Sequence, residues 1–266
     1  MIWKRIVARA ISEVCSFTRL NERRSGLRIL LYHAVGSHLS GDNYGISIEP
    51  KLFERQMRSL AGNGSVRVVG LDNATLSDAA LQVAVTFDDG YKDNLRTAAP
   101  VLLKYQIPFT VFVTSSFLKK NSGVYLTSEE LKELALLPGV TIGSHGASHQ
   151  PLAKCDDLTL SRELADSHSE IEDIIGRPVK YFSYPHGSVT RRVRDAASRA
   201  GYVLGACSRF GVNHQSRDIM LLCRCEVVAA DSERVFSQKL SGAWDWYKCW
   251  LADPADDSRG LRNGLT

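Results

Sequence analysis

The sequence predicts an α/β protein whose parallel strands close into a barrel. Short apolar runs typical of buried strands recur along the chain, at residues 27–33, 66–69, 81–87, 109–113, 140–144, 180–184, 202–206 and 224–228. Segments with helical spacing of apolar residues lie between them, at 50–61, 91–105, 128–136, 158–175, 190–200 and 232–240. This alternation is typical of βαβ units, and seven or eight such strands favour a barrel over an open sheet.

Length and composition predict one main domain. The chain has 266 residues, 44% of them hydrophobic and 23% charged, which suffices for a barrel-sized domain with a full core. We expect an amphipathic helix and linker over 1–26, the barrel over 27–250 and a flexible tail over 251–266. No apolar run is long enough to span a membrane, no signal peptide is evident and the six cysteines lack a C-x-x-C spacing. We therefore expect reduced cysteines and a cytoplasmic location.

Positive charge is concentrated at the N-terminus. Seven basic residues against two acidic ones give residues 1–28 a net charge of +5, which leaves −1 for the rest of a chain of net charge +4. Apolar residues from Ile2 to Phe17 fall on one helical stripe beside Lys4, Arg5 and Arg9, as in a helix that lies in a membrane interface. Peripheral membrane association through residues 1–24, at the inner face, and docking on the barrel both remain open. No nucleic-acid partner is expected, because no basic patch with interleaved aromatic residues recurs later.

The first strand and the first helix of the barrel have clear sequence signals. The apolar run 27–33 ends in His33, and a polar loop follows over 36–45. The next segment begins at Pro50, a residue suited to the first turn of a helix, and continues with apolar residues at helical spacing, namely Leu52, Phe53, Met57 and Leu60. This order predicts one strand, one loop and one helix of a βα unit.

Two adjacent carboxylates, Asp88 and Asp89, come directly after the apolar run 81–87 and before a helical segment. A strand-to-helix turn is a usual place for functional groups in α/β proteins, because the sheet fixes the end of the strand. A divalent metal would compensate the repulsion between the two acids, since one could be a ligand while the other accepts a proton from water. On its own, an Asp-Asp-Gly stretch also fits a solvated turn.

Two histidines, His145 and His149, follow the apolar run 140–144. Histidines four residues apart converge on one ion if their segment begins a helical turn. Together with Asp89 they would form a set of two imidazoles and one carboxylate that leaves positions open for water and substrate. Open positions are typical of a catalytic metal site.

A third strand end leads into a Pro/Gly loop, Tyr184-Pro185-His186-Gly187. Such a loop can direct backbone N–H groups into a cavity. In type and order, the Thr86–Gly90 stretch, the His-x-x-x-His pair and this loop resemble the three motifs of the polysaccharide deacetylase family, also called the NodB-homology or carbohydrate esterase 4 family. The resemblance spans roughly residues 27–230.

The resemblance implies a fold, a cofactor and a set of roles. The fold would be a distorted (β/α)7 barrel of the NodB type. Asp88 would be the general base, whereas Asp89, His145 and His149 would hold a divalent metal, for which we expect Zn²⁺. The loop after the third strand end would contact the substrate and lend a backbone donor to the oxyanion, and its substrate-binding residues would be Tyr184, Pro185 and His186.

Two positions depart from the common pattern of the family. Many members carry a late Leu-x-His motif that supplies the acid for the leaving amine, whereas no histidine follows residue 214 in this chain. The early His33 resembles the branch typified by biofilm poly-N-acetylglucosamine deacetylases, in which the barrel is circularly permuted, and would be the acid. Ser183 stands where many members have arginine, and we name Arg224 as a substrate-site residue that could reach Asp88 instead.

The resemblance implies a metal-dependent hydrolase that removes an N-acetyl group from an amino sugar in a polysaccharide or a lipid-linked glycan. A deformylase or O-deacetylase remains an alternative, because the same groups would serve any acyl substituent that fits. A non-catalytic glycan-binding member is a second alternative. His186 could contact substrate or pack within its loop, and the aromatic residues Trp244, Trp246, Tyr247 and Trp250 could stack on a sugar, close the barrel or meet a membrane.

Overall fold

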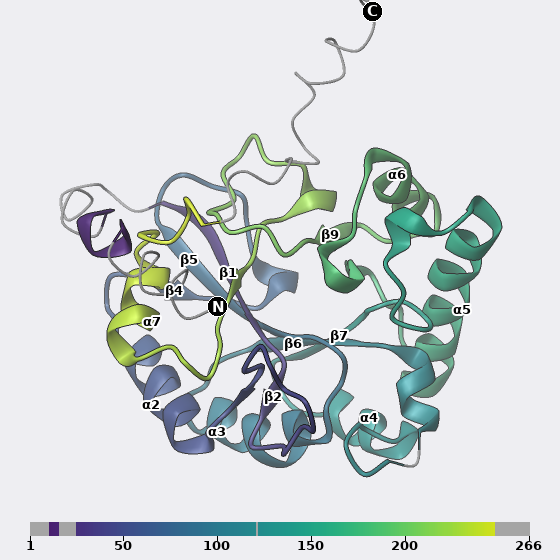
Figure 1. Cartoon of the computed structure of the whole chain (residues 1–266), viewed down its shortest axis with the longest axis horizontal. Coiled ribbons are helices and arrows are strands. Elements are labelled where there is room, and N and C mark those ends of the chain that lie inside the picture. Colours follow the sequence, from purple (N-terminus) through teal and green to yellow (C-terminus); the bar gives the residue numbers. More distant parts are fainter. Residues whose placement is uncertain (1–10, 16–24, 121, 248–266) are drawn as a thin grey trace, which may run out of the picture.

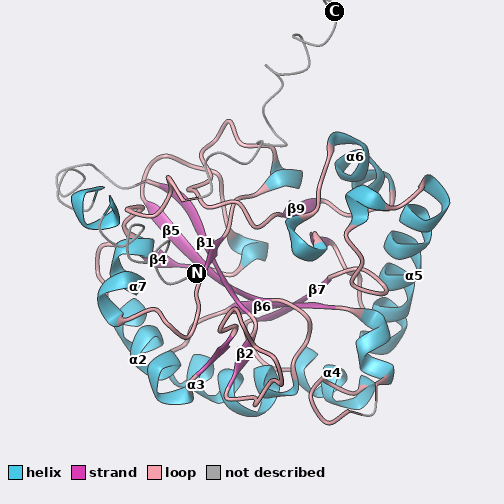
Figure 2. Ribbon diagram, in the orientation of Figure 1, coloured by secondary structure: helices cyan, strands magenta, loops and turns pink. Residues whose placement is uncertain are grey.

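The computed structural model describes residues 11–15, 25–120 and 122–247. The predicted N-terminal helix therefore lies mostly outside the described residues, and the predicted tail lies wholly outside them. Within the described parts, no helix is both long enough and apolar enough to cross a membrane. The strands lie at the centre and the helices lie around them (Figures 1 and 2).

All strands of the main sheet run parallel, in the order β10-β1-β5-β6-β7-β8-β9. A further strand, β4, pairs in parallel with the first half of β5. The bounds are β1 Gly26–Tyr32, β4 Arg67–Val68, β5 Leu81–Phe87, β6 Phe109–Val113, β7 Val140–Ser144, β8 Tyr181–Ser183, β9 Leu204–Ala206 and β10 Cys225–Glu226. Two short parallel strands, β2 Ala34–Val35 and β3 Ser47–Ile48, form a separate sheet after β1.

One segment joins the two ends of the main sheet. Leu222 pairs with Ala206 of β9 in a parallel bridge, and its N–H donates to the carbonyl of Gly205 at 2.8 Å. Three residues later, β10 pairs with β1 through Leu30 and Cys225. This segment therefore links β9 to β1 through β10 and closes the sheet, which confirms the predicted distorted (β/α)7 barrel.

Helices follow the strands and cover the outside of the barrel (Figure 1). They are α2 Pro50–Ala61, α3 Ala99–Lys104, α4 Ser128–Ala135, α5 Asp157–Ile175, α6 Arg191–Arg199 and α7 Glu233–Leu240. A π-helical turn, Asn94–Ala98, leads into α3, so the predicted helix over 91–105 begins later and with wider hydrogen bonding than its apolar spacing suggested. The starts of α4 and α5 are capped by Thr127 and Asp156, whose side chains accept from backbone N–H groups.

The core has two layers. A small cluster of apolar side chains lies together in the barrel, and its members are Leu27, Ile29, Val69, Leu71, Ala84, Phe112, Leu204 and Leu222. A much larger cluster packs between the sheet and the helices. Side chains of a strand alternate between its two faces, so residues four positions after Ile29 and Ala84 point to the same face as these two residues. Those residues are His33 and Asp88, at the carboxyl ends of β1 and β5.

The segment after α7 packs against the barrel. Asp245 accepts two hydrogen bonds of 2.9 Å from Arg28, a fully buried side chain of β1. Trp244 lies beside Trp246 and Tyr247, with Trp244 mostly buried. These contacts show that the described part of the aromatic cluster covers the barrel, whereas Trp250 lies outside the described residues.

Residues 11–15 are helical and contact the same end of the molecule. Ser12 accepts a 3.1 Å hydrogen bond from the Trp246 indole, and Glu13 pairs with Arg234 of α7. The apolar side chains of Ile11 and Val14 are 40% and 64% exposed. The polar residues of this short piece therefore face the barrel while two apolar residues face outward.

Candidate functional site

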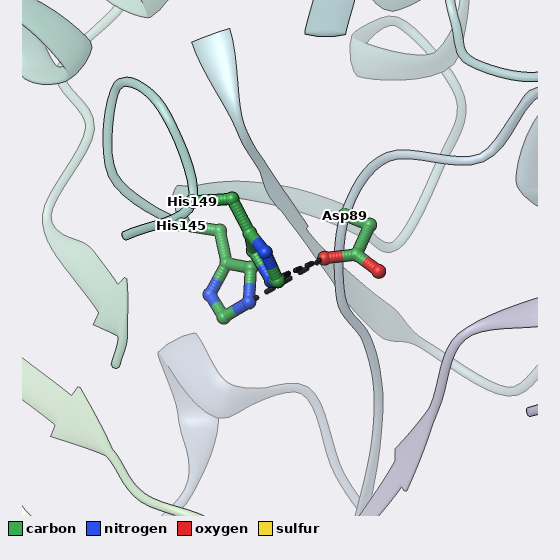
Figure 3. A group of neighbouring side chains, drawn as sticks. All are labelled: Asp89, His145 and His149. Atoms are coloured by element: carbon green, nitrogen blue, oxygen red, sulfur yellow. Dashed lines mark ion pairs between the residues drawn. The ribbon is translucent and has the colours of Figure 1, made fainter. Parts of the chain in front are cut away.

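The predicted metal ligands meet at the carboxyl ends of β5 and β7. Asp89 Oδ1 lies 3.1 Å from His149 Nε2 and 3.5 Å from His145 Nε2. The three ligand atoms all lie within 4.8 Å of one another. Figure 3 shows the three side chains turned toward one another. Asp89 and His145 are buried, and His149 is partly exposed. The structure thus brings together three residues from two loops, which the sequence related only through their motifs.

The backbone of these loops takes unusual conformations. Asp89 and His149 have φ values of 73° and 65°, in the left-handed region that non-glycine residues seldom adopt. The histidines were expected to converge if a helical turn began at His145, but the segment 145–149 is not helical. They converge because the loop turns back on itself, with Gly146 at φ 78° at its start.

A carboxylate from α5 holds that loop in place. Glu163 Oε2 accepts hydrogen bonds from the N–H groups of Ala147, at 3.0 Å, and Ser148, at 2.9 Å, while Oε1 accepts from the Ser148 hydroxyl. The Glu163 side chain is 5% exposed, and a Cβ on Gly146 would lie 3.2 Å from its Oε2. The sequence analysis missed this residue, although an acid on the inward face of an otherwise apolar helical stripe was a signal for it.

The donor atoms fit a cation. His145 Nδ1 lies 2.7 Å from the Ser183 carbonyl, which can only accept, so Nδ1 donates and Nε2 presents its lone pair when the ring is neutral. Burial lowers the pKa of His145 to about 4, which keeps the ring neutral. That lone pair faces Asp89 Oδ1, a buried oxygen that has no hydrogen bond within the described residues. Two facing lone pairs repel, and a divalent cation between them would remove the repulsion.

Asp88, in contrast, is held by the protein. Arg224 donates to both of its oxygens at 2.7 Å, and the Ser183 hydroxyl donates to Oδ2 at 3.1 Å. Burial alone would raise the pKa of Asp88, but the Arg224 guanidinium and His145 hold it below its usual range. The carboxylate is therefore ionised and oriented without being a member of the ligand set.

Arg224 reaches Asp88, as the sequence analysis suggested. Its side chain is fully buried, and it also donates to the Ser183 hydroxyl at 2.8 Å and the Cys207 carbonyl at 3.1 Å. The ring of Phe112 lies 5.6 Å beneath the guanidinium. Because the side chain is fully buried against these groups, its assignment as a substrate-binding residue is corrected to one that holds Asp88.

His33 lies beside Asp88 at the rim. The two strands are in register, since Tyr32 pairs with Phe87, and the Asp88 N–H donates to the Tyr32 carbonyl at 3.0 Å. Asn94, at the start of the π-helical turn, donates to the His33 carbonyl at 2.8 Å. The Nδ1 atom of His33 is buried and has no hydrogen-bond partner in the part of the chain that the structure describes. His33 is near enough to help lower the pKa of both Asp88 and Asp89.

The Pro/Gly loop buries Tyr184 and Pro185 and exposes His186. The Tyr184 side chain is fully buried and donates to the Met220 carbonyl at 2.9 Å, which corrects its assignment as a substrate-binding residue. Its N–H donates to the Ala206 carbonyl, and the Gly187 N–H donates to the Tyr184 carbonyl. Pro185 has no N–H. The His186 N–H, at a φ of 58°, therefore remains as the donor of this loop, and the His186 ring lies 4.4 Å from the His149 ring.

Comparisons with known proteins agree with the fold and the motifs. A sequence model of the polysaccharide deacetylase family matches residues 78–205. YxkH of Bacillus subtilis (strain 168), provisionally named a polysaccharide deacetylase, is 29% identical over 226 residues, which cover 81% of this chain and 76% of that protein.

Two solved structures share the fold over most of the chain. The Streptococcus pyogenes deacetylase PplD, described in complex with acetate, has a TM-score of 0.71 at 23% identity and is covered over 98% of its chain by 81% of this one. IcaB from Ammonifex degensii has a TM-score of 0.67 at 26% identity, over 84% of this chain and 98% of its own.

Proposed function

We propose that this chain, which belongs to the polysaccharide deacetylase family, is a metal-dependent hydrolase that removes an N-acetyl group from an amino sugar. The substrate would be a polysaccharide or a lipid-linked glycan. One observation carries the proposal, namely the different surroundings of two adjacent aspartates. Asp88 is bound by Arg224, whereas Asp89 has a buried oxygen that faces two histidines and accepts no hydrogen bond within the described residues.

This difference supports separate roles for the two carboxylates. Asp89, His145 and His149 would hold a divalent ion, for which Zn²⁺ suits the mixed imidazole and carboxylate set, and that ion would polarise the acyl carbonyl and acidify a water molecule. Asp88 would accept a proton from the water that attacks the carbonyl carbon. Because Arg224 and Ser183 fix the carboxylate, little reorganisation is needed at this step.

The rest of the reaction requires an oxyanion donor and an acid. The His186 N–H would stabilise the negative charge that develops on the acyl oxygen, since the other backbone donors of its loop are already engaged. His33 would donate a proton to the amine nitrogen as the C–N bond breaks, because an amide nitrogen is a very poor leaving group without protonation. Its position beside Asp88 supports this role, because the acid and the base would then lie at the same end of the barrel.

The test is acetate release from N-acetylglucosamine oligomers and from a lipid-linked N-acetylhexosamine, with and without a chelator. We expect acetate and a free amine in equal amounts, lost on chelation and restored by the metal. Formate would indicate a deformylase, and acetate without amine an O-deacetylase. Intact substrate in the presence of bound metal would indicate a glycan-binding protein.

We further propose that residues 1–24 bring the enzyme to an anionic membrane surface at its inner face. The basic residues of this segment and the outward-facing Ile11 and Val14 support this location. The contacts of Ser12 and Glu13 with the barrel support the alternative of a docked helix. Binding to anionic vesicles distinguishes the membrane-bound segment from the docked helix.

A further inference from the structure

An aromatic cluster continues from the metal ligands along one side of the site. We call it the aromatic rim and define it as Tyr91 and Phe117, which are buried, and Tyr125, which is half-buried. The Phe117 ring centroid lies 5.7 Å from that of His149 and 4.4 Å from that of Tyr125. Tyr91 and Tyr125 are stacked, with centroids 5.1 Å apart and ring planes 28° apart. The rim is therefore a run of rings that begins at a metal ligand.

The rim is fixed to the loop that carries Asp88 and Asp89. Tyr91 and Tyr125 pair in an antiparallel bridge, and the Leu126 N–H donates to the Gly90 carbonyl at 3.0 Å. One residue further, the Lys92 N–H donates to the Val124 carbonyl at 2.9 Å. The rim therefore has a defined position relative to the reacting atoms, as a surface that orients a substrate requires.

A lysine lies over this rim. The Lys120 ammonium is 3.8 Å from the centroid of Phe117 and 5.6 Å from that of Tyr125. The neighbouring Lys119 is paired with Glu170, and Lys92 with Glu130. Within the described residues, Lys120 has no carboxylate partner.

We propose that Lys120 binds an anionic substituent of the glycan, a phosphate or a carboxylate, while Tyr125, the least buried ring of the rim, contacts the sugar that carries it. Pyranose rings present an apolar face that suits aromatic side chains, and an ammonium beside them suits an anion. A neutral glycan would contact Tyr125 but would leave Lys120 without an anionic partner. The substrate class is thus an acidic N-acylated glycan. This inference rests on the proposed function and narrows its substrate.

The test compares three ligands that share one N-acetylglucosamine trisaccharide. One is neutral, one carries a phosphate at its reducing end, and one carries a carboxylate on a lactyl ether. Affinity is measured by calorimetry on the metal-loaded chain with Asp88→Asn, which requires no turnover, and kcat/KM is measured separately on the chain with Asp88 intact. Lys120→Met removes the charge and keeps the length, Lys120→Arg keeps the charge, and Lys119→Met is the matched control.

We expect one or both anionic ligands to bind roughly 3- to 10-fold more tightly than the neutral one, as one charge-assisted contact at an accessible site would give. Lys120→Met should abolish that preference, Lys120→Arg should keep most of it and Lys119→Met should leave it unchanged. The phosphate and carboxylate arms then identify the anion. Equal affinity for all three ligands, or equal effects of Lys120→Met and Lys119→Met, would overturn the inference. Absence of acetate release alongside retained anion preference would contradict only the proposed reaction.

Discussion

Arg224 donates one hydrogen bond to each oxygen of Asp88, both at 2.7 Å, across 136 positions of the sequence. Both side chains are nearly inaccessible to solvent. A buried ion pair of this geometry costs much desolvation, so its value lies less in stability than in fixing the carboxylate. The pair also links two distant parts of the barrel, because it joins the segment after β9 to the end of β5.

Replacing Arg224 should therefore lower the stability of the fold strongly. Arg224→Met leaves the Asp88 carboxylate buried and without its counter-charge, and we expect a loss of about 3–5 kcal/mol in the free energy of unfolding. Ser183→Ala, which removes the hydroxyl that bonds both charged groups but leaves the ion pair in place, should cost about 1–3 kcal/mol. Denaturant unfolding at pH 7 measures both. Wild-type stability in Arg224→Met would mean that the pair does not form.

Replacing Glu163 should weaken metal binding without touching a ligand. In Glu163→Gln the carboxylate charge is lost and the amide nitrogen can no longer accept from the Ser148 hydroxyl, so the loop between His145 and His149 is held less firmly. We expect zinc affinity to fall by about 10- to 100-fold, as for other groups that orient ligands. Competition with a chromophoric chelator measures it, and Glu170→Gln on the same helix is the control. Equal zinc affinity in both variants would show that the loop holds its shape without Glu163.

His33→Ala should slow amide hydrolysis by about 10²- to 10⁴-fold, because the leaving amine would lack its proton donor. Metal content should not change, since His33 is not one of the three ligands. An aryl acetate, whose leaving group needs no proton, should be hydrolysed almost as fast as by the wild type. A similar loss on amide and aryl ester would assign His33 a structural role.

Deleting residues 1–24 should release the chain from anionic vesicles at low salt and leave hydrolysis of a small glycan intact. Each basic residue near such a surface contributes on the order of 1 kcal/mol, and salt screens the attraction beyond a Debye length of about 8 Å. Sedimentation with vesicles measures the effect. Failure of the full-length chain to sediment, or unfolding of the deleted chain, would support the docked helix that the Ser12 and Glu13 contacts suggest.

Much of the framework could be predicted from local signals. The strand bounds of β5, β6 and β7 match the apolar runs 81–87, 109–113 and 140–144, because buried parallel strands are continuous in apolar residues. The order of these strands also placed Asp89 and His145 at the same edge of the sheet, and in the structure β6 separates their strands while Asp89 Oδ1 lies 3.5 Å from His145 Nε2. These inferences needed only the rule that parallel strands end on one side.

The parts that could not be predicted depend on side-chain direction and on contacts between distant segments. Tyr184 lies in a motif loop, yet its ring points into the core and its hydroxyl meets the Met220 carbonyl. Glu163 contacts the histidine loop only because α5 packs there, and no local spacing encodes that packing. The roles of His33, His186 and Pro185 in catalysis or substrate binding stay predictions.

The most direct test of the account measures metal content and acetate release together, in the wild type and in two adjacent substitutions. Asp89→Asn should lose the ion and, with it, turnover, because Asp89 provides the only carboxylate of the proposed ligand set. Asp88→Asn should retain about one ion per chain and still lose most of its turnover, because Asp88 would move the proton and not bind the metal. Near-wild-type acetate release by Asp88→Asn, or full activity in protein free of metal, would contradict the account.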